Sequence, residues 1–431
     1  MSDRSFFKAL GPGLLFAGAA IGVSHLVQST RAGATYGLGL ILFVLVANIS
    51  KYPAFSFGPR YAAATGTSLL EGYRRQGTWA LVLYAVLTAG TMFTVQAAVT
   101  AVTAGLFITL WPVEILPVSV GSTTITPLVS VSTGAIALCS LLLVFGGYRW
   151  LDRIMKVVVV VLTVTTVAAT ALSLPQLDAG SLVPWPAADD WNLKTAFFVA
   201  GLMGWMPTAI DISVWHSLWT LARSRDSGHT PTVREAMLDF NIGYIGTAGL
   251  AFCFLVMGAA VMHDSGIQFQ DSAAAFAGQI IGLYTSTLGG WAGPLVSVAA
   301  FSVMFSTTLT VVDGFARAIA ALVARFGSPE TAETAEGDRR VYWLALAVLG
   351  LGSVAILHSY VSGLKGLVDL ATTISFLTAP VLAWLNHRAI LSDAVAQADR
   401  PSAALQRFSA VSIAFLAVLA VGWLVLRFGF A

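Results

Sequence analysis

The sequence predicts an all-α membrane protein that crosses the bilayer many times. Two observations carry this fold class: 57% of the 431 residues are hydrophobic, and only 10% are charged. A soluble domain needs a more polar surface, so this composition is typical of a polytopic membrane protein. A third observation is that the apolar residues gather in runs of about 20 or more, the length with which an α-helix crosses roughly 30 Å of hydrocarbon.

Eleven apolar runs are predicted to be transmembrane helices. They lie at residues 9–35, 38–62, 79–110, 127–147, 154–174, 194–221, 236–262, 289–324, 341–358, 362–388 and 406–428. They are too long and too uniformly apolar for barrel strands. Most of the 23 Lys and Arg residues fall in alternate loops, which predicts a cytoplasmic N-terminus and an outside C-terminus. We expect a bacterial inner (plasma) membrane protein, with an amphipathic outer segment at 264–284.

Catalytic motifs are missing from the chain. The sequence contains no P-loop GxxxxGK[ST], so ATP hydrolysis is not expected. HExxH and GxSxG are absent as well, and the loops are too short for a separate catalytic domain. We therefore expect a transporter or channel rather than an enzyme, with no cofactor and no nucleic-acid partner. Its expected partners are the lipid bilayer and a small solute or ion.

Two of the predicted helices contain residues that interrupt a helix. The first has Gly22, Ser24 and His25 at its midpoint, and the sixth has Pro207 shortly before Asp211. Proline removes an amide donor and clashes with the preceding turn, so a break close to Pro207 is expected. Breaks at corresponding places five helices apart are typical of an inverted-repeat secondary transporter, whose substrate lies between them.

This pattern predicts one transmembrane domain over residues 1–431 with a 5+5 arrangement. The first five-helix repeat is expected at 9–174, the second, inverted repeat at 194–388, and an additional helix at 406–428.

Three stretches resemble the Nramp divalent-metal transporters. "GPGLLFAGAAI", followed after four residues by "LVQSTRAGATYGLGLI", is similar to the first helix of that family; "LVANISKYPAFSFGPRYAAATG" is similar to its second helix and "HSLWTLARSR" to the end of its sixth. The resemblance implies eleven helices in the leucine-transporter-like fold, with the N-terminus inside. These are matches of scaffold, so they indicate fold more strongly than substrate.

The metal ligands of the family are replaced in this sequence. Where the family has Asp-Pro-Gly-Asn in helix 1, the chain reads Gly22-Val23-Ser24-His25. The helix 6 Met-Pro-His motif aligns without a gap to Ala209-Ile210-Asp211, whereas a match to Met206-Pro207-Thr208 needs a three-residue insertion. The predicted substrate site is therefore Gly22, Ser24, His25, Thr208, Ala209 and Asp211. No metal site is assigned, and His25 with Asp211 is the only candidate pair.

Three further residues are assigned to the pathway or to coupling. Against the third helix of the family, the acidic positions of the proton pathway appear as Phe93 and Gln96. Lys51 lies inside helix 2, where a charge is costly and by default suggests function, and Thr372 lies within helix 10. Lys51 could pair with Asp211 or Asp369, extend into a cavity, or stand in for a coupling cation.

Three functions remain open on the sequence. The leading one is a secondary transporter working by alternating access, for a small organic or anionic solute or another ion that is not a soft transition metal. The alternative within the class is a divalent cation held by His25, Asp211 and carbonyl groups. The alternative of another class is a sensor or structural membrane protein that has lost transport.

Overall fold

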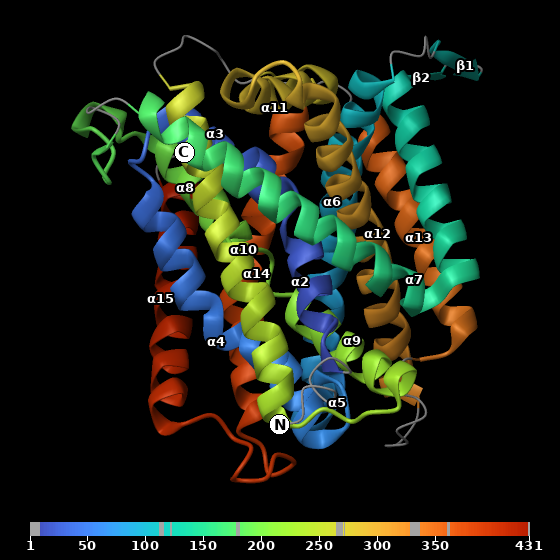
Figure 1. Ribbon diagram of the computed structural model, residues 1–431. Coiled ribbons are helices and arrows are strands. Elements are labelled where there is room, and N and C mark those ends of the chain that lie inside the picture. Colours follow the sequence, from blue (N-terminus) through green and yellow to red (C-terminus); the bar gives the residue numbers. More distant parts are fainter. Residues whose placement is uncertain are drawn as a thin grey trace.

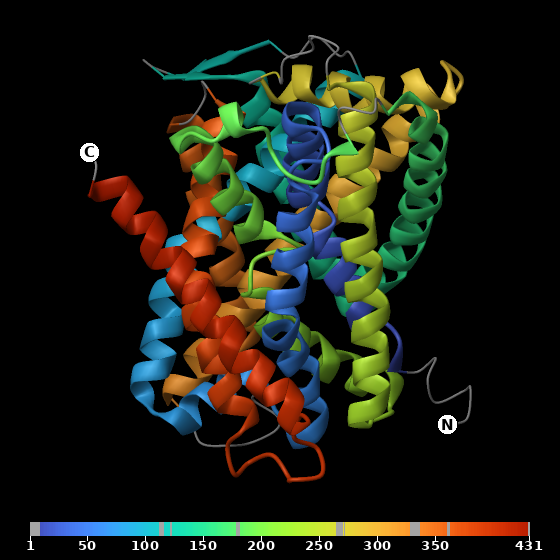
Figure 2. The same cartoon turned by 90° about the vertical axis from the view of Figure 1, so that its left-hand side faces the viewer.

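The computed structural model describes residues 9–111, 116–120, 123–177, 182–263, 270, 272–327, 337–359 and 363–429. Long helices run side by side between two ends of the molecule and form one bundle (Figures 1 and 2). The uninterrupted long helices are α4 (Ile41–Thr65), α6 (Thr78–Leu110), α7 (Pro127–Ser173), α10 (Val233–Val261), α12 (Ala292–Gly327), α13 (Arg339–Ser359), α14 (Leu364–Ile390) and α15 (Ala403–Phe428). Within the described residues, nine uninterrupted segments are long and apolar enough to cross a membrane, two of them in α7.

The first predicted helix is bent at a break, as its sequence indicates. It consists of α2 (Pro12–Ala20), the π-helical turn η1 (Ser24–Ser29) and α3 (Thr30–Tyr36), with a bend of 45° between the two halves. The sixth predicted helix consists of α8 (Leu193–Trp205) and α9 (Ile212–Ser227). Pro207 lies in the extended segment between them, where its missing amide interrupts no helical hydrogen bond.

Two further predicted segments can be located in the structure. Residues 127–147 and 154–174 were expected as two transmembrane helices, and two apolar segments long enough to cross a membrane lie there, Pro127–Gly146 and Met155–Gln176, with the helix α7 (Pro127–Ser173) continuous between them. The amphipathic segment contains the helix α11 (Ala273–Leu288), which lies across one end of the bundle in Figure 1. An amphipathic helix can rest one face on the bundle without crossing the membrane, so hydropathy alone does not reveal it.

Short elements close the two ends of the bundle. The strands β1 (Val118–Val120) and β2 (Thr123–Ile125) form an antiparallel hairpin with Val120 opposite Thr123, at the same end as α11 (Figure 1). The helix α5 (Leu69–Gln76) lies at the opposite end. Single 3₁₀ turns, η2 (Leu174–Gln176) and η4 (Ala188–Asp190), occur in the connection from α7 to α8.

Close backbone contact holds α2 against α10. A Cβ atom added at Gly13 would lie 2.0 Å from the carbonyl oxygen of Asp239, and one at Gly243 would lie 2.0 Å from the oxygen of Gly13. The carboxylate of Asp239 also accepts hydrogen bonds from the backbone amides of Gly11 (3.0 Å) and Gly13 (2.6 Å) at the start of α2. A negative charge is favourable at a helix N-terminus. The first half of helix 1 is therefore fixed to α10 at its start, at the end of α2 that lies away from the break.

Candidate functional site

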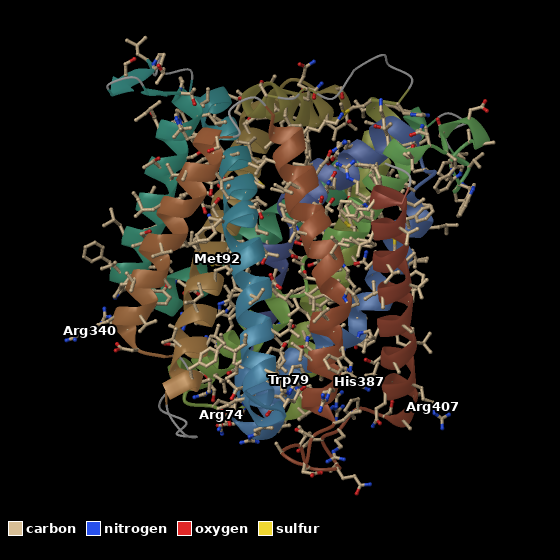
Figure 3. All side chains as sticks on the ribbon, turned by 180° about the vertical axis from the view of Figure 1, so that it is seen from behind. Arg74, Trp79, Met92, Arg340, His387 and Arg407 are labelled. Atoms are coloured by element: carbon tan, nitrogen blue, oxygen red, sulfur yellow. The ribbon has the colours of Figure 1, made fainter. Side chains whose placement is uncertain are left out.

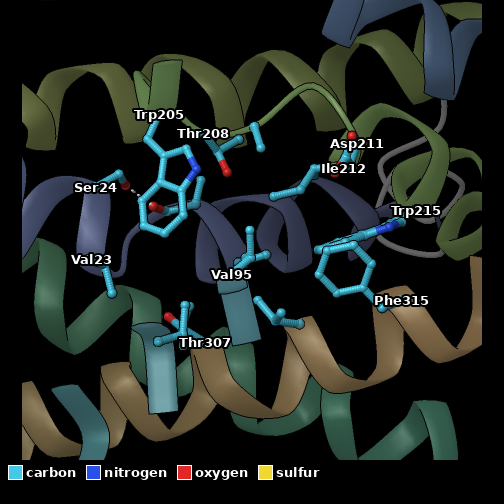
Figure 4. A pocket seen from close by; sticks show the side chains of 15 residues that line it. Val23, Ser24, Val95, Trp205, Thr208, Asp211, Ile212, Trp215, Thr307 and Phe315 are labelled. Atoms are coloured by element: carbon cyan, nitrogen blue, oxygen red, sulfur yellow. Dashed lines mark hydrogen bonds between the residues drawn. The ribbon is translucent and has the colours of Figure 1, made fainter. Parts of the chain in front are cut away.

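A buried cavity of about 30 Å³ lies between the two breaks (Figure 4). Helices 1 and 6 contribute most of its wall, and α6 and α12 complete it. The lining residues are Ala19, Ala20, Val23, Ser24, Val95, Val99, Trp205, Thr208, Ala209, Asp211, Ile212, Trp215, Thr307, Val311 and Phe315. Most of this wall is apolar.

The helix 1 break is closed by a hydroxyl group from α12. Thr307 Oγ1 lies 2.8 Å from the carbonyl oxygen of Gly18 and 3.3 Å from that of Ile21, and it can donate to either. Carbonyl oxygens freed by a helix break need such a donor when they are buried. A Cβ atom at Gly22 would lie 2.7 Å from Thr307 Cγ2, so the space that an aspartate would need at this position is occupied by Thr307.

The imidazole of His25 is fully buried and turned towards α10. Its Nδ1 atom is 2.7 Å from the hydroxyl of Ser24, and its Nε2 atom donates to the carbonyl oxygen of Thr247 at 2.9 Å. The Ser24 hydroxyl also lies 2.6 Å from the carbonyl oxygen of Ala20 and can donate to it. Both ring nitrogens of His25 are thus engaged, and His25 is not among the residues that line the cavity.

The helix 6 break is held by the ammonium group of Lys51. Lys51 Nζ donates to the carbonyl oxygens of Gly204 (2.6 Å) and Thr208 (3.3 Å), and the side chain is fully buried. Lys51 forms no ion pair with either carboxylate considered from the sequence. In the described part of the chain, Asp369 instead pairs with Arg31 at 2.7 Å. The buried ammonium group therefore supplies hydrogen-bond donors to carbonyl oxygens at the end of α8 and in the unwound segment that follows it.

Among the described lining residues, Asp211 is the only one with an ionisable side chain. It precedes the first residue of α9, is 2% exposed, and accepts a hydrogen bond from Thr91 Oγ1 on α6 at 3.1 Å. Figure 4 shows Asp211 at the end of the unwound segment, near Ile212 and Trp215. Its position at the N-terminus of α9 favours a negative charge there.

Not every predicted residue lies at the cavity. Ser24, Thr208, Ala209 and Asp211 line it, and Gly22 packs against the lining residue Thr307. The remaining predicted residues, His25, Lys51, Gln96 and Thr372, do not line it. Gln96 Nε2 donates to the hydroxyl of Thr100 one turn along α6, and the Thr372 hydroxyl donates to the carbonyl oxygen of Asp369.

Lining residues that were not predicted as site residues include three aromatic residues, Trp205, Trp215 and Phe315, and the hydroxyl-bearing Thr307. Trp215 follows Asp211 by four residues, so helical spacing after the break could have placed both on one face. Thr307 and Phe315 carry no such local signal, because only the packing of α12 against helix 1 brings them to the cavity. Across the described residues, no group of three or more His, Cys, Asp or Glu side chains could hold a metal ion.

Sequence comparison assigns the family. The Nramp family, described as natural resistance-associated macrophage protein-like, matches residues 13–426. This chain belongs to the Nramp family. An uncharacterized relative, protein PM0681 of Pasteurella multocida (strain Pm70), is 35% identical over 392 residues, which are 90% of this chain and 86% of the relative.

Solved structures confirm the fold class of this Nramp protein. A histidine-to-alanine mutant of the Eremococcus coleocola manganese transporter is similar with a TM-score of 0.70 at 14% identity, over 100% of this chain and 90% of that one. The same transporter bound to an aromatic bis-isothiourea compound gives a TM-score of 0.68, also at 14% identity, over 97% and 86%. The Nramp protein therefore has the leucine-transporter-like fold of an integral membrane protein, and its family comprises transporters rather than enzymes.

Proposed function

We propose that this Nramp protein is a secondary transporter working by alternating access, with its substrate site in the cavity between the two breaks. Its substrate is a small ion or solute that is not bound as a divalent metal ion. The family membership and the shared fold support the transporter class. The position of the cavity between two unwound helices supports the location of the site, because such breaks expose polar backbone groups to a substrate.

The observation that carries the proposal is the occupation of the freed carbonyl groups. Thr307 lies within hydrogen-bonding distance of the Gly18 and Ile21 carbonyl oxygens in helix 1, and Lys51 donates to those of Gly204 and Thr208 in helix 6. A divalent ion needs several oxygen, nitrogen or sulfur ligands, usually including anionic ones. Asp211 is the single anionic group available to it among the described lining residues.

The second candidate is a divalent cation in altered coordination. The similarity to a manganese transporter favours it. The thioether at the helix 6 break does not favour it, because Met206 Sδ lies 3.6 Å from the hydroxyl of Ser29 and Met206 is not a lining residue. A sensor or structural role without transport is the third candidate.

The proposed orientation places the α5 end of the bundle in the cytoplasm. Arg74, Arg340 and Arg407 all lie towards this end in Figure 3. Excess basic residues on one side mark the cytoplasmic side of a membrane protein. The start of α2 lies at this end and the end of α15 lies towards the opposite one (Figures 1 and 2), which supports a cytoplasmic N-terminus and an outside C-terminus.

A ligand screen on the purified protein tests the proposal. Thermal shift or calorimetry is measured with manganese, magnesium, sodium, bicarbonate, amino acids and amines, on wild type and on Asp211→Asn and His25→Ala. We expect binding of a ligand other than a divalent metal ion, and we expect this binding to be lost in Asp211→Asn. Saturable manganese binding that both variants abolish would favour the divalent-cation alternative, and no binding together with no uptake into reconstituted vesicles would favour a role without transport.

A further inference from the structure

We propose that the cavity takes a small monovalent alkylammonium cation, of the size of methylammonium. This inference rests on the proposed function, because it names the substrate class of the same site. Four properties of the cavity point to this class: its charge, its aromatic wall, the small number of side-chain oxygen atoms in the wall, and its size.

The charge of the cavity matches a single positive charge. Asp211 is the only ionisable side chain among the described lining residues, and its described partner is the neutral hydroxyl of Thr91. A monovalent cation beside this carboxylate leaves the pair neutral. A divalent ion would leave one uncompensated charge against an apolar wall, which is costly. The ammonium of Lys51, bound to the carbonyl of the lining residue Thr208, would add to this cost by repulsion.

Aromatic rings form the part of the wall that an organic cation can use. Trp215 and Phe315 pack edge to face with their ring centroids 4.6 Å apart. Figure 4 shows this pair at one end of the cavity and the ring of Trp205 projecting towards its middle. The face of an aromatic ring attracts an ammonium group, and methyl groups also pack well against such rings. An inorganic cation that needs oxygen ligands gains much less from this wall.

The wall has few side-chain oxygen atoms with which to surround a metal or alkali ion. Among the described lining residues, these oxygen atoms belong to Ser24, Thr208, Asp211 and Thr307. The hydroxyl of Thr208 makes no hydrogen bond to the described residues, and it lines the cavity with the Asp211 carboxylate. An alkylammonium group needs only two or three acceptors for its N–H groups, and these two side chains supply them.

The size of the cavity sets an upper limit on the cation. A water molecule needs about 10–15 Å³ of a cavity measured in this way. The volume of about 30 Å³ therefore holds a ligand of two or three heavy atoms in this conformation. Methylammonium fits this limit and an amino acid does not.

Isothermal titration calorimetry on the purified full-length protein tests the inference. Methylammonium chloride is the probe, and sodium chloride and manganese chloride are titrated at matched ionic strength. The variants are Asp211→Asn, which removes the charge, and Phe315→Leu, which removes one ring. Asp189→Asn, at an exposed aspartate of the turn η4 that does not line the cavity, is the matched control. We expect saturable methylammonium binding, about tenfold weaker or more in Asp211→Asn and several-fold weaker in Phe315→Leu. Asp189→Asn should bind like wild type.

The contrary results are distinguishable. If sodium or a neutral solute binds in an Asp211-dependent way and methylammonium does not, the alkylammonium class is wrong while the proposed function stands; if manganese does so, the divalent-cation alternative replaces the proposed substrate as well. If nothing binds and reconstituted vesicles accumulate nothing, the proposed function itself fails. Should Asp211→Asn not purify as a folded protein, Phe315→Leu decides: unchanged methylammonium affinity in that variant overturns the inference.

Discussion

Gly22 is packed so closely that a larger side chain would meet Thr307. The position resembles that of the family's helix 1 aspartate, yet even a Cβ atom there would lie 2.7 Å from Thr307 Cγ2. Thr307 is fixed in turn by its contacts to the helix 1 carbonyls. The glycine therefore leaves room for a threonine of α12, whose hydroxyl can donate its single proton to one carbonyl group of the break.

Gly22→Ala is expected to lower the melting temperature of the protein. The added methyl group must displace Thr307 from a packed wall, and overpacking of this kind costs about 1–3 kcal/mol of unfolding free energy. Gly90→Ala is the control, because a Cβ atom at Gly90 meets no other residue within 4 Å. Thermal melting of both variants should show a loss for Gly22→Ala and no loss for Gly90→Ala. Equal melting temperatures would contradict the close packing of Gly22.

Lys51→Met is expected to destabilise the helix 6 break. The substitution keeps the length of the side chain but leaves the carbonyls of Gly204 and Thr208 without their donor. Each unsatisfied buried group costs about 1–3 kcal/mol, partly offset because a buried charge is removed. Thermal melting and uptake measurements should both show a loss, and Lys194→Met, at an exposed lysine, should show neither. A stable, active Lys51→Met protein would rule out this role.

The N-terminus of helix α2 is capped by a carboxylate from another helix. Its first amides donate to the carboxylate of Asp239 on α10, and α2 has no capping side chain of its own. Helix 1 is thus attached to α10 on both sides of its break. Asp239 binds the half before the break, and the carbonyl of Thr247 binds His25 after it. Movement of one half of helix 1 would have to break one of these two attachments.

Asp239→Ala is expected to loosen α2 without unfolding the bundle. Removing a capping carboxylate costs about 1–2 kcal/mol. Hydrogen exchange should accelerate at the amides of α2 and remain unchanged in α15, which packs elsewhere. Asp393→Ala, at an exposed aspartate, serves as the control. Unchanged exchange in α2 would show that the cap contributes little.

Prediction from sequence succeeded where a feature is local. Apolar length located the spans, and Pro207 located the helix 6 break. The orientation of His25 could not be found in this way, because a turn of π-helix over Ser24–Ser29 decides which way it points. The partners of Lys51 were not predicted either, since it donates to carbonyl groups on the two sides of the α8 terminus, of Gly204 and Thr208, rather than to a carboxylate. Side chains that meet across hundreds of residues, such as Thr307 and Gly18, leave no local pattern.

At the scale of the whole molecule, a buried ion network ties α5 to α12 at the end of the bundle proposed as cytoplasmic. Glu71 is 1% exposed and lies 3.1 Å from Arg325 Nε and 2.7 Å from Arg74 Nη2. Burial by itself raises the pKa of Glu71, but the hydrogen bond from Arg74 and the charges of Arg325, Arg74 and Arg75 outweigh it and lower the pKa below its ordinary value. The network therefore needs the ionised carboxylate.

Acid is expected to weaken this end of the molecule through Glu71. Because its folded pKa lies below that of the unfolded chain, about 4.3, its contribution to stability is complete above the unfolded pKa and is lost as the pH falls through the folded one. The melting temperature of Glu71→Gln should be lower than that of wild type at neutral pH, and the difference should shrink below about pH 4. A difference that does not change with pH would contradict the assignment.

Our proposal that this Nramp protein does not hold a divalent metal ion between its broken helices can be tested by diffraction. Anomalous data are collected at the manganese edge from crystals soaked in manganese chloride. We expect no anomalous peak in the cavity between Asp211 and the helix 1 break. A peak bound to Asp211 and to the carbonyl oxygens of helix 1, with Thr307 moved aside, would contradict it.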